Sequence, residues 1–187
     1  MSADQIKHLA TEEVQEYIFA HANDDDENKL LLKHKTILGV PAQLIVQQIA
    51  ARKKAQTKLP FFYSTKGIVY PPSLNLEQSS SEATAKFKAK IIREEFHGKK
   101  ITGADLTGGF GIDSHFLSKV SETLDYVEPN LELLEIVKHN HAQLENEKIE
   151  YHQATAEDFL KEKKGFDYIF LDPSRRNSQS KKSLSFK

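Results

Sequence analysis

Short apolar segments alternate with helix-forming segments between residues 101 and 171, and this alternation constrains the fold more than any other feature of the sequence. The segments with strand character are residues 101–106, 123–127, 148–152 and 166–171. Between them, residues 113–120, about 129–144 and 156–164 have the character of crossover helices. Strands joined by helical crossovers predict a parallel, doubly wound α/β sheet. The last strand is apolar at nearly every position, which is typical of burial on both faces.

The chain before this region predicts a small, mostly helical N-terminal domain over residues 1–70. Apolar residues spaced three to five apart indicate an amphipathic helix over residues 4–20. A second helix is expected over about 42–55. We place a boundary near residues 71–80, so that residues 71–187 form the second domain.

Two local signals lie on either side of this boundary. Residues 61–64 and 68–70 flank Thr65-Lys66-Gly67, a pattern that predicts a short hairpin with the glycine in the turn. Further along, Ser79-Ser80-Ser81-Glu82 has the form of a capping box. It predicts a helix from there to about residue 96.

Charge is balanced overall but not locally. The chain has 26 Lys and Arg against 27 Asp and Glu, with 39% apolar residues, a globular composition. Residues 51–66 and 175–187 contain basic residues and no acid. Such stretches can attract phosphate, although a solvated helix end is the simpler interpretation of residues 51–58.

Several classes of protein are excluded or disfavoured by composition. The absence of cysteine excludes a disulfide framework, a zinc ribbon, an iron–sulfur cluster and a thiol nucleophile. No apolar run reaches the roughly 18 residues that cross a bilayer. The acidic N-terminus lacks the order of a secretory signal. We therefore expect a soluble, cytoplasmic protein that does not contact membranes.

The strongest chemical signal is the segment Asp105-Leu-Thr-Gly-Gly-Phe-Gly-Ile-Asp113, which follows the first strand of the sheet and opens a helix. Gly109 and Gly111 allow a ligand to approach the backbone closely, and free amides at a helix start favour an anionic group. This is the context of a nucleotide-binding turn. A tight strand-to-helix connection without a ligand is the alternative.

Acidic residues end two of the predicted strands. Glu128 ends the second strand, where an acid in a doubly wound fold can accept hydrogen bonds from both hydroxyls of a ribose. Asp172 and Pro173 follow the fourth strand, at the carboxyl edge where open α/β sheets hold ligands. An Asp at the end of an apolar strand must be paired or exposed in a cleft. The alternatives are a solvated helix cap for Glu128 and a strand-ending turn for Asp172.

From residue 79 onward the chain resembles the class I S-adenosylmethionine-dependent methyltransferases. DLTGGFG is similar to the first motif of that family, which implies a cradle for the methionine part of the cofactor. The resemblance assigns this cradle to Asp105, Thr107, Gly109 and Gly111. It also places Glu128 on the ribose.

The same resemblance extends to the adenine and acceptor sides of the site. The segment QATAEDF stands where the family contacts adenine, and it leaves that contact open between Thr155 and Glu157. DPSRR stands where amino-group methyltransferases carry Asp or Asn, two prolines and an aromatic residue. The implied catalytic residues are Asp172, Pro173 and Ser174. Arg175 and Arg176 would bind substrate.

Three segments resemble a narrower, uncharacterised Bacteroidetes family that carries a THUMP-like RNA-binding domain further along the chain. They are LEQSSSEATAKFKA, DLTGGFGIDSHF and FLDPSRR. The first and last motifs of the methyltransferase region are also similar to those of ribosomal RNA guanine-N2 methyltransferases, and there is a related likeness to trimethylguanosine synthases. These resemblances imply an RNA partner, either tRNA or rRNA.

The resemblance also implies a truncated sheet. Class I methyltransferases have seven strands, whereas only four can be found here. In the family's strand order these four form the half-sheet 3-2-1-4, which carries the cofactor site. The fourth strand would then be an exposed edge that promotes self-association.

The remaining candidate residues are weaker. His139 and His141 are two apart, so their imidazoles point in different directions on a helix, and no metal site is expected there. His97 and His115 are expected to be surface or cap residues. Taken together, the sequence predicts an S-adenosylmethionine-dependent methyltransferase acting on an exocyclic amine of an RNA base, guanine N2 above all. The alternatives are a non-catalytic cofactor- or RNA-binding fragment, and a methyltransferase for a protein or small molecule.

Overall fold

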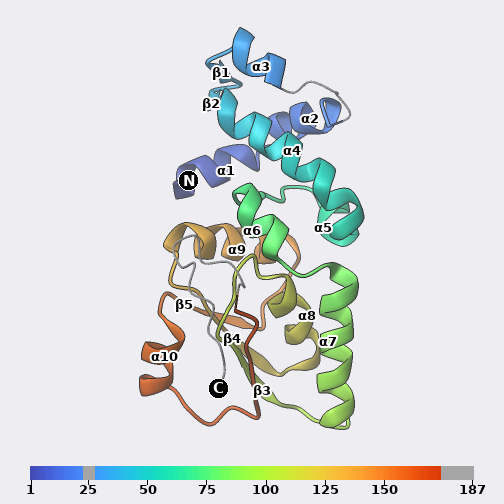
Figure 1. Ribbon diagram of the computed structural model, residues 1–187, viewed down its shortest axis with the longest axis vertical. Coiled ribbons are helices and arrows are strands. Elements are labelled where there is room, and N and C mark those ends of the chain that lie inside the picture. The colour runs from blue at the N-terminus through green and yellow to red at the C-terminus, as the bar shows by residue number, and fades with distance from the viewer. Residues whose placement is uncertain (23–27, 174–187) are drawn as a thin grey trace, which may run out of the picture.

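The four predicted strands form one parallel sheet in the computed structural model, which describes residues 1–22 and 28–173 (Figure 1). The strands are β3 (Thr102–Asp105), β4 (Thr123–Val127), β5 (Ile149–His152) and β6 (Tyr168–Phe170). Their order is β5-β4-β3-β6, which confirms the predicted half-sheet. The chain moves outward from β3 to β5 and then crosses to the other side of β3. Such a reversal is where open α/β sheets bind ligands.

One helix precedes β3 and three helices cross between the strands of the sheet, and three of these four begin at a residue whose side chain caps them. They are α7 (Glu82–Glu95), α8 (Ile112–Val120), α9 (Leu131–Gln143) and α10 (Ala156–Glu162). Ser81, Asn130 and Thr155 each accept a hydrogen bond from an amide in the first turn of α7, α9 and α10. The predicted capping box therefore begins two residues too early, because Ser79 ends the preceding helix, α6 (Ser73–Gln78). Figure 1 shows α7 beside α8.

The N-terminal region is helical, as predicted, but its elements differ from the prediction in two places. Residues 4–20 form two helices, α1 (Ala3–Leu9) and α2 (Glu12–Ala20), because the first ends at Ala10 and Thr11, the residue before the second, has an extended backbone. The other elements are α3 (Asn28–Lys33), β1 (Thr36–Ile37), β2 (Val40–Pro41), α4 (Ala42–Lys58) and α5 (Pro60–Ser64).

The hairpin predicted around Thr65-Lys66-Gly67 is wrong. Residues 61–64 lie in α5, which begins at Pro60, a residue suited to the first turn of a helix. The buried carboxylate of Glu82 accepts hydrogen bonds from the amides of Phe61 and Phe62 and so caps this helix from a distance in sequence. The hairpin of the N-terminal region is instead β1–β2.

One apolar core joins the N-terminal helices to the sheet. Phe62 of α5 packs against Phe110 and His115, and the side-chain amide of Asn140 in α9 bonds both backbone groups of Val69. A smaller cluster lies between the sheet and α10. In Figure 1, α6 lies between the N-terminal helices and the sheet. No helix in the described ranges is long and apolar enough to cross a membrane.

The last strand is less buried than its sequence predicts. Only Tyr168 is buried in β6, whereas Ile169 is 46% exposed and the following Leu171 is 59% exposed. The reason is that β6 pairs with β3 alone among the described strands, so its second edge has no neighbour there. The prediction of burial on both faces is therefore wrong for this structure.

Candidate functional site

A cleft of about 970 Å³ opens at the carboxyl ends of β3, β4 and β6. Its walls are the loop after β3, the loop after β4, the start of α10, the residues after β6, and the helix α6. Most of the residues singled out in the sequence meet here. The described lining residues that carry a charge are all acidic: Glu77, Asp113, Glu128, Glu157 and Asp172.

The glycine loop after β3 has a backbone conformation that lets a ligand approach it closely. Gly109 and Gly111 have positive φ angles of 55° and 72°, as expected for positions that favour glycine. A side chain at Gly111 would also lie 2.5 Å from Val137 of α9. Gly108, which the sequence reasoning passed over, is equally constrained: a Cβ there would lie 2.3 Å from the ring of Tyr126. That ring lies under the loop, and its hydroxyl donates to the carbonyl of Gly109 at 2.7 Å.

Asp105 stabilises the glycine loop through hydrogen bonds. Its buried carboxylate accepts hydrogen bonds from the amide of Thr107 at 3.0 Å and the hydroxyl of Ser114 at 2.5 Å. It therefore joins the loop to α8. Burial raises the pKa of the Asp105 carboxyl to about 6, although these hydrogen bonds oppose the rise.

Glu128 lies across the cleft from α6 and contacts the loop directly. One carboxylate oxygen accepts from the amide of Gly109 at 3.1 Å and the other from the amide of Asn130 at 2.9 Å. Burial raises the pKa of the Glu128 carboxyl above its ordinary value, and the two backbone hydrogen bonds only partly offset this. An ionised carboxylate offers about four acceptor sites, so two remain for ligand donors.

Thr155 and Glu157 lie at the start of α10 and also line the cleft. The Thr155 hydroxyl caps the helix by accepting from the amide of Asp158 at 3.2 Å. Glu157 lies in the first turn of the helix. Both residues are thus at the wall where the sequence predicted an adenine contact, and the structure does not choose between them.

Asp172 and Pro173 reach the cleft from β6. The amide of Asp172 donates to the Thr107 hydroxyl at 2.8 Å, which ties the residues after β6 to the glycine loop. The Asp172 carboxylate pairs with Lys88 of α7 at 2.8 Å. Ser174, Arg175 and Arg176 lie outside the described residues.

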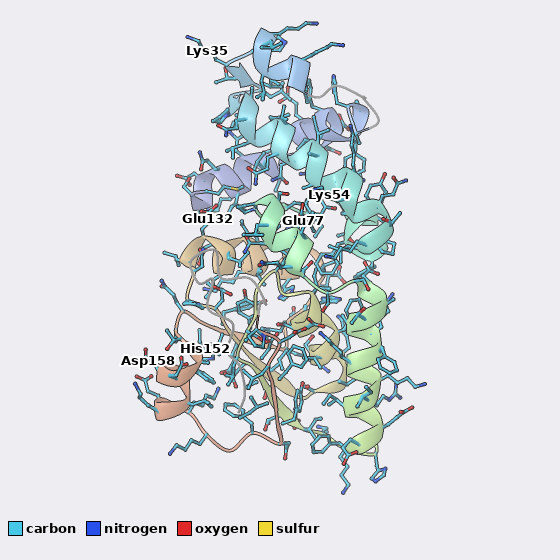
Figure 2. All side chains as sticks on the ribbon, viewed as in Figure 1. Lys35, Lys54, Glu77, Glu132, His152 and Asp158 are labelled. Atoms are coloured by element: carbon cyan, nitrogen blue, oxygen red, sulfur yellow. The ribbon has the colours of Figure 1, made fainter. Side chains whose placement is uncertain are left out.

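The wall formed by α6 was not predicted. Leu74, Asn75, Glu77 and Gln78 of this helix line the cleft. Two lysines of the basic stretch in α4 hold it in place. Lys54 pairs with Glu77 at 2.6 Å (Figure 2). Lys58 donates to the carbonyls of Leu76 and Glu77. These two lysines therefore position the wall of the cleft, a role that no local pattern indicates.

The histidines are structural in this fold. His115 is buried rather than at the surface, because α5 packs over it with Phe61 and Phe62. His139 bonds the carbonyl of Gly67, whereas His141 bonds the carbonyl of Gly111 beneath the loop. Their different directions agree with the prediction. Burial lowers the pKa of His115 to about 3 and that of His141 to about 4, so both are neutral near pH 7.

A second polar cluster lies between β4, β5 and α10. The ligand atoms of Asp125, Glu150 and His152 are within 4.8 Å of one another (Figure 2 labels His152). The Lys163 ammonium lies 2.6 Å from Asp125 and 2.9 Å from Glu150. Since this ammonium contacts both carboxylates and His152 contacts Asp125, the cluster is a polar and ion-pair network.

Comparison with known proteins supports the fold. No protein-family model and no curated protein sequence matches the chain. Among solved structures, the chain is similar to a candidate methyltransferase from Porphyromonas gingivalis W83, with a TM-score of 0.63 and 28% identity over 80% of this chain. The chain spans 35% of the length of that protein. The sheet, the glycine loop and this likeness define a Rossmann-like methyltransferase fold.

Proposed function

We propose that the cleft binds S-adenosylmethionine and forms the cofactor site of a methyltransferase. The observation that supports this best is the acidic lining around the glycine loop, in which neither Glu128 nor Glu157 pairs with a lysine among the described residues. S-adenosylmethionine has a sulfonium and an ammonium group against one carboxylate, so it carries a net positive charge. A dinucleotide would instead bring a pyrophosphate close to these carboxylates, which like charges disfavour.

The residues of the cleft fit each part of this cofactor. The loop from Thr107 to Gly111 lies next to the start of α8, where the backbone can hold the methionine part. Glu128 has acceptor sites for both ribose hydroxyls. Thr155 and Glu157 would meet the adenine. When bound, S-adenosylmethionine supplies an electrophilic methyl group.

Asp172 and Pro173 would hold the acceptor. The Asp172 carboxylate and the Pro173 carbonyl can accept hydrogen bonds from an exocyclic amine and thereby turn its lone pair toward the methyl group. Methyl transfer there would form the N–C bond as the C–S bond breaks, with S-adenosylhomocysteine as the leaving group, and the nitrogen would afterwards lose its proton to water. The negative charge of Asp172 opposes the positive charge that develops on that nitrogen.

The acceptor that we favour is guanine N2 of an RNA. The support is the likeness of the DLTGGFG and DPSRR segments to RNA guanine-N2 methyltransferases. Arg175 and Arg176 would contact phosphate or stack on a base. A protein or small-molecule acceptor, or binding without transfer, are the other outcomes of the test.

The test is transfer of a radiolabelled methyl group from S-adenosylmethionine to total RNA. Incorporation should disappear after nuclease treatment, and Asp172→Asn should lower the rate by roughly 10²–10³-fold, as expected for losing a charge-assisted contact of ~3–4 kcal/mol. Asp4→Asn, an exposed residue of α1, is the matched control and should match the wild type. Label that survives nuclease would indicate a different acceptor, and cofactor binding without incorporation would contradict catalysis by this chain.

A further inference from the structure

A lysine outside the predicted site contacts the residue on which methyl transfer would depend. Lys88 lies in α7, between Ala85 and Ala89, the two alanines that α7 buries. Its side chain is consequently drawn inward and is only 22% exposed. No motif identified in the sequence includes it as a functional residue.

The Lys88 ammonium is surrounded by oxygen atoms from three parts of the chain. It donates to Oδ2 of Asp172 at 2.8 Å and to the hydroxyl of Ser80 at 3.0 Å. It also lies 3.2 Å from Oδ1 of Asp113, in the first turn of α8. The Ser80 hydroxyl in turn donates to the other oxygen of Asp113 at 2.8 Å. The three donors of an ammonium match this set of three neighbours.

The positive charge of Lys88 compensates the carboxylates of Asp113 and Asp172 together. Oδ1 of Asp113 is buried and accepts no hydrogen bond, so the nearby ammonium compensates its charge. Burial by itself lowers the pKa of Lys88, but Asp172 and Asp113 outweigh that effect and raise it, so Lys88 stays charged. Without Lys88, two carboxylates of like charge would remain close together, and the more exposed one, Asp172, is free to move away.

Lys88 and Thr107 together fix the orientation of Asp172. Thr107 holds the backbone amide of Asp172, and Lys88 holds Oδ2 of its side chain. Within the described residues no hydrogen bond reaches the second oxygen, Oδ1, which leaves it for a donor in the cleft. The ring of Phe170 lies 4.8 Å from the ammonium and limits its position further.

We propose that Lys88 is a positioning residue that holds the Asp172 carboxylate in the orientation needed to accept a hydrogen bond from the amine that is methylated. It also couples Asp172 to Asp113 at the start of α8. This role rests on the proposed methyltransferase function, because Asp172 acts on an acceptor only there. Lys88 acts through Asp172 and is not itself a catalytic residue.

The experiment compares Lys88→Met, which keeps the length of the side chain and removes its charge, with Lys88→Arg, which keeps the charge. Lys90→Met is the matched control, since Lys90 is an exposed lysine of the same helix that pairs only with Glu94 among the described residues. For Lys88→Met we expect kcat for methyl transfer to fall at least tenfold, with the dissociation constant of S-adenosylhomocysteine changed less than about threefold. Lys88→Arg should recover part of the rate. In an Asp172→Asn background, Lys88→Met should have no further effect.

A readout that does not need activity separates this proposal from the proposed function. The rotamer of the Asp172 side chain, measured by three-bond scalar couplings in the full chain, should become averaged in Lys88→Met and stay fixed in Lys90→Met. The charged groups facing Asp172 are Lys88 and, behind it, Asp113. A rotamer that stays fixed in Lys88→Met, or a loss of kcat that is additive with Asp172→Asn, would overturn the role of Lys88. Absence of methyl transfer in the wild type, with the expected change in the Asp172 rotamer, would overturn only the proposed function.

Discussion

Removing the Glu128 carboxylate should weaken cofactor binding while leaving the fold intact. In the structure this carboxylate already accepts one hydrogen bond at each oxygen, from Gly109 and Asn130, and keeps acceptor sites open toward the cleft. Hydrogen bonds to a charged group contribute ~1.5–3 kcal/mol each, but the two ribose hydroxyls would share oxygens that are already in use. We therefore expect Glu128→Ala to cost about 2–3 kcal/mol of binding free energy. That corresponds to an affinity loss of about 30- to 150-fold.

The assay is calorimetric titration with S-adenosylhomocysteine, which needs no acceptor. Glu135→Ala, on α9 outside the cleft and paired only with Lys138 among the described residues, is the control for removing a glutamate near the site. Water in the cleft can replace the carboxylate at the amides of Gly109 and Asn130, so the thermal midpoint without ligand should change little. An affinity for Glu128→Ala within about twofold of the wild type would refute the ribose assignment.

Three further predictions follow from the packing. Burial lowers the pKa of His115 and His141, so these two residues bind more protons in the unfolded chain below about pH 6.5. Their contribution to stability should fall as the pH drops from 7 toward 4, opposite in sign to that of the Asp105 carboxyl, whose pKa is raised. His115→Phe should therefore lose less stability than the wild type between pH 7 and 4 in urea titrations, and an identical change would exclude His115 as a cause. Gly108→Ala should lower the free energy of unfolding by ~2 kcal/mol or more, because the added Cβ would meet the ring of Tyr126. Gly98 has a positive φ but open space around it, so Gly98→Ala should lower the free energy of unfolding by only about 1 kcal/mol. Equal losses for the two variants would contradict the steric argument. The exposed apolar residues at β6 should make the chain associate with increasing concentration, as measured by light scattering. Ile169→Lys should reduce this association. A monomer at all concentrations would argue against an open edge at β6.

The sheet and the loop were predictable because their signals are local. Strands separated by crossover helices leave few possible topologies, and the sequence from Asp105 to Gly111 specifies its turn through glycines. The meeting of Glu128, Thr155 and Asp172 in one cleft follows from the fold, since the carboxyl ends of parallel strands share an edge. The roles of the individual site residues remain predictions.

The features that sequence reasoning missed depend on contacts between distant segments. Phe61 and Phe62 suggest a strand by composition, but Glu82, about twenty residues away, caps them as a helix. His115 is buried because α5 covers it. The wall of α6 depends on Lys54 and Lys58, whose basic stretch indicated a solvated helix end or a contact with phosphate. None of these contacts has a periodic pattern that a single sequence reveals.

The most direct test of the central claim is the effect of S-adenosylhomocysteine and of NADH on the thermal unfolding of this chain. The account predicts that S-adenosylhomocysteine at a thousandfold excess over its dissociation constant stabilises the fold by ~4 kcal/mol. NADH, whose pyrophosphate would face Glu128 and Glu157, the two cleft carboxylates without a lysine partner among the described residues, should give no shift. Stabilisation by NADH with none from S-adenosylhomocysteine would contradict the assignment of the cleft.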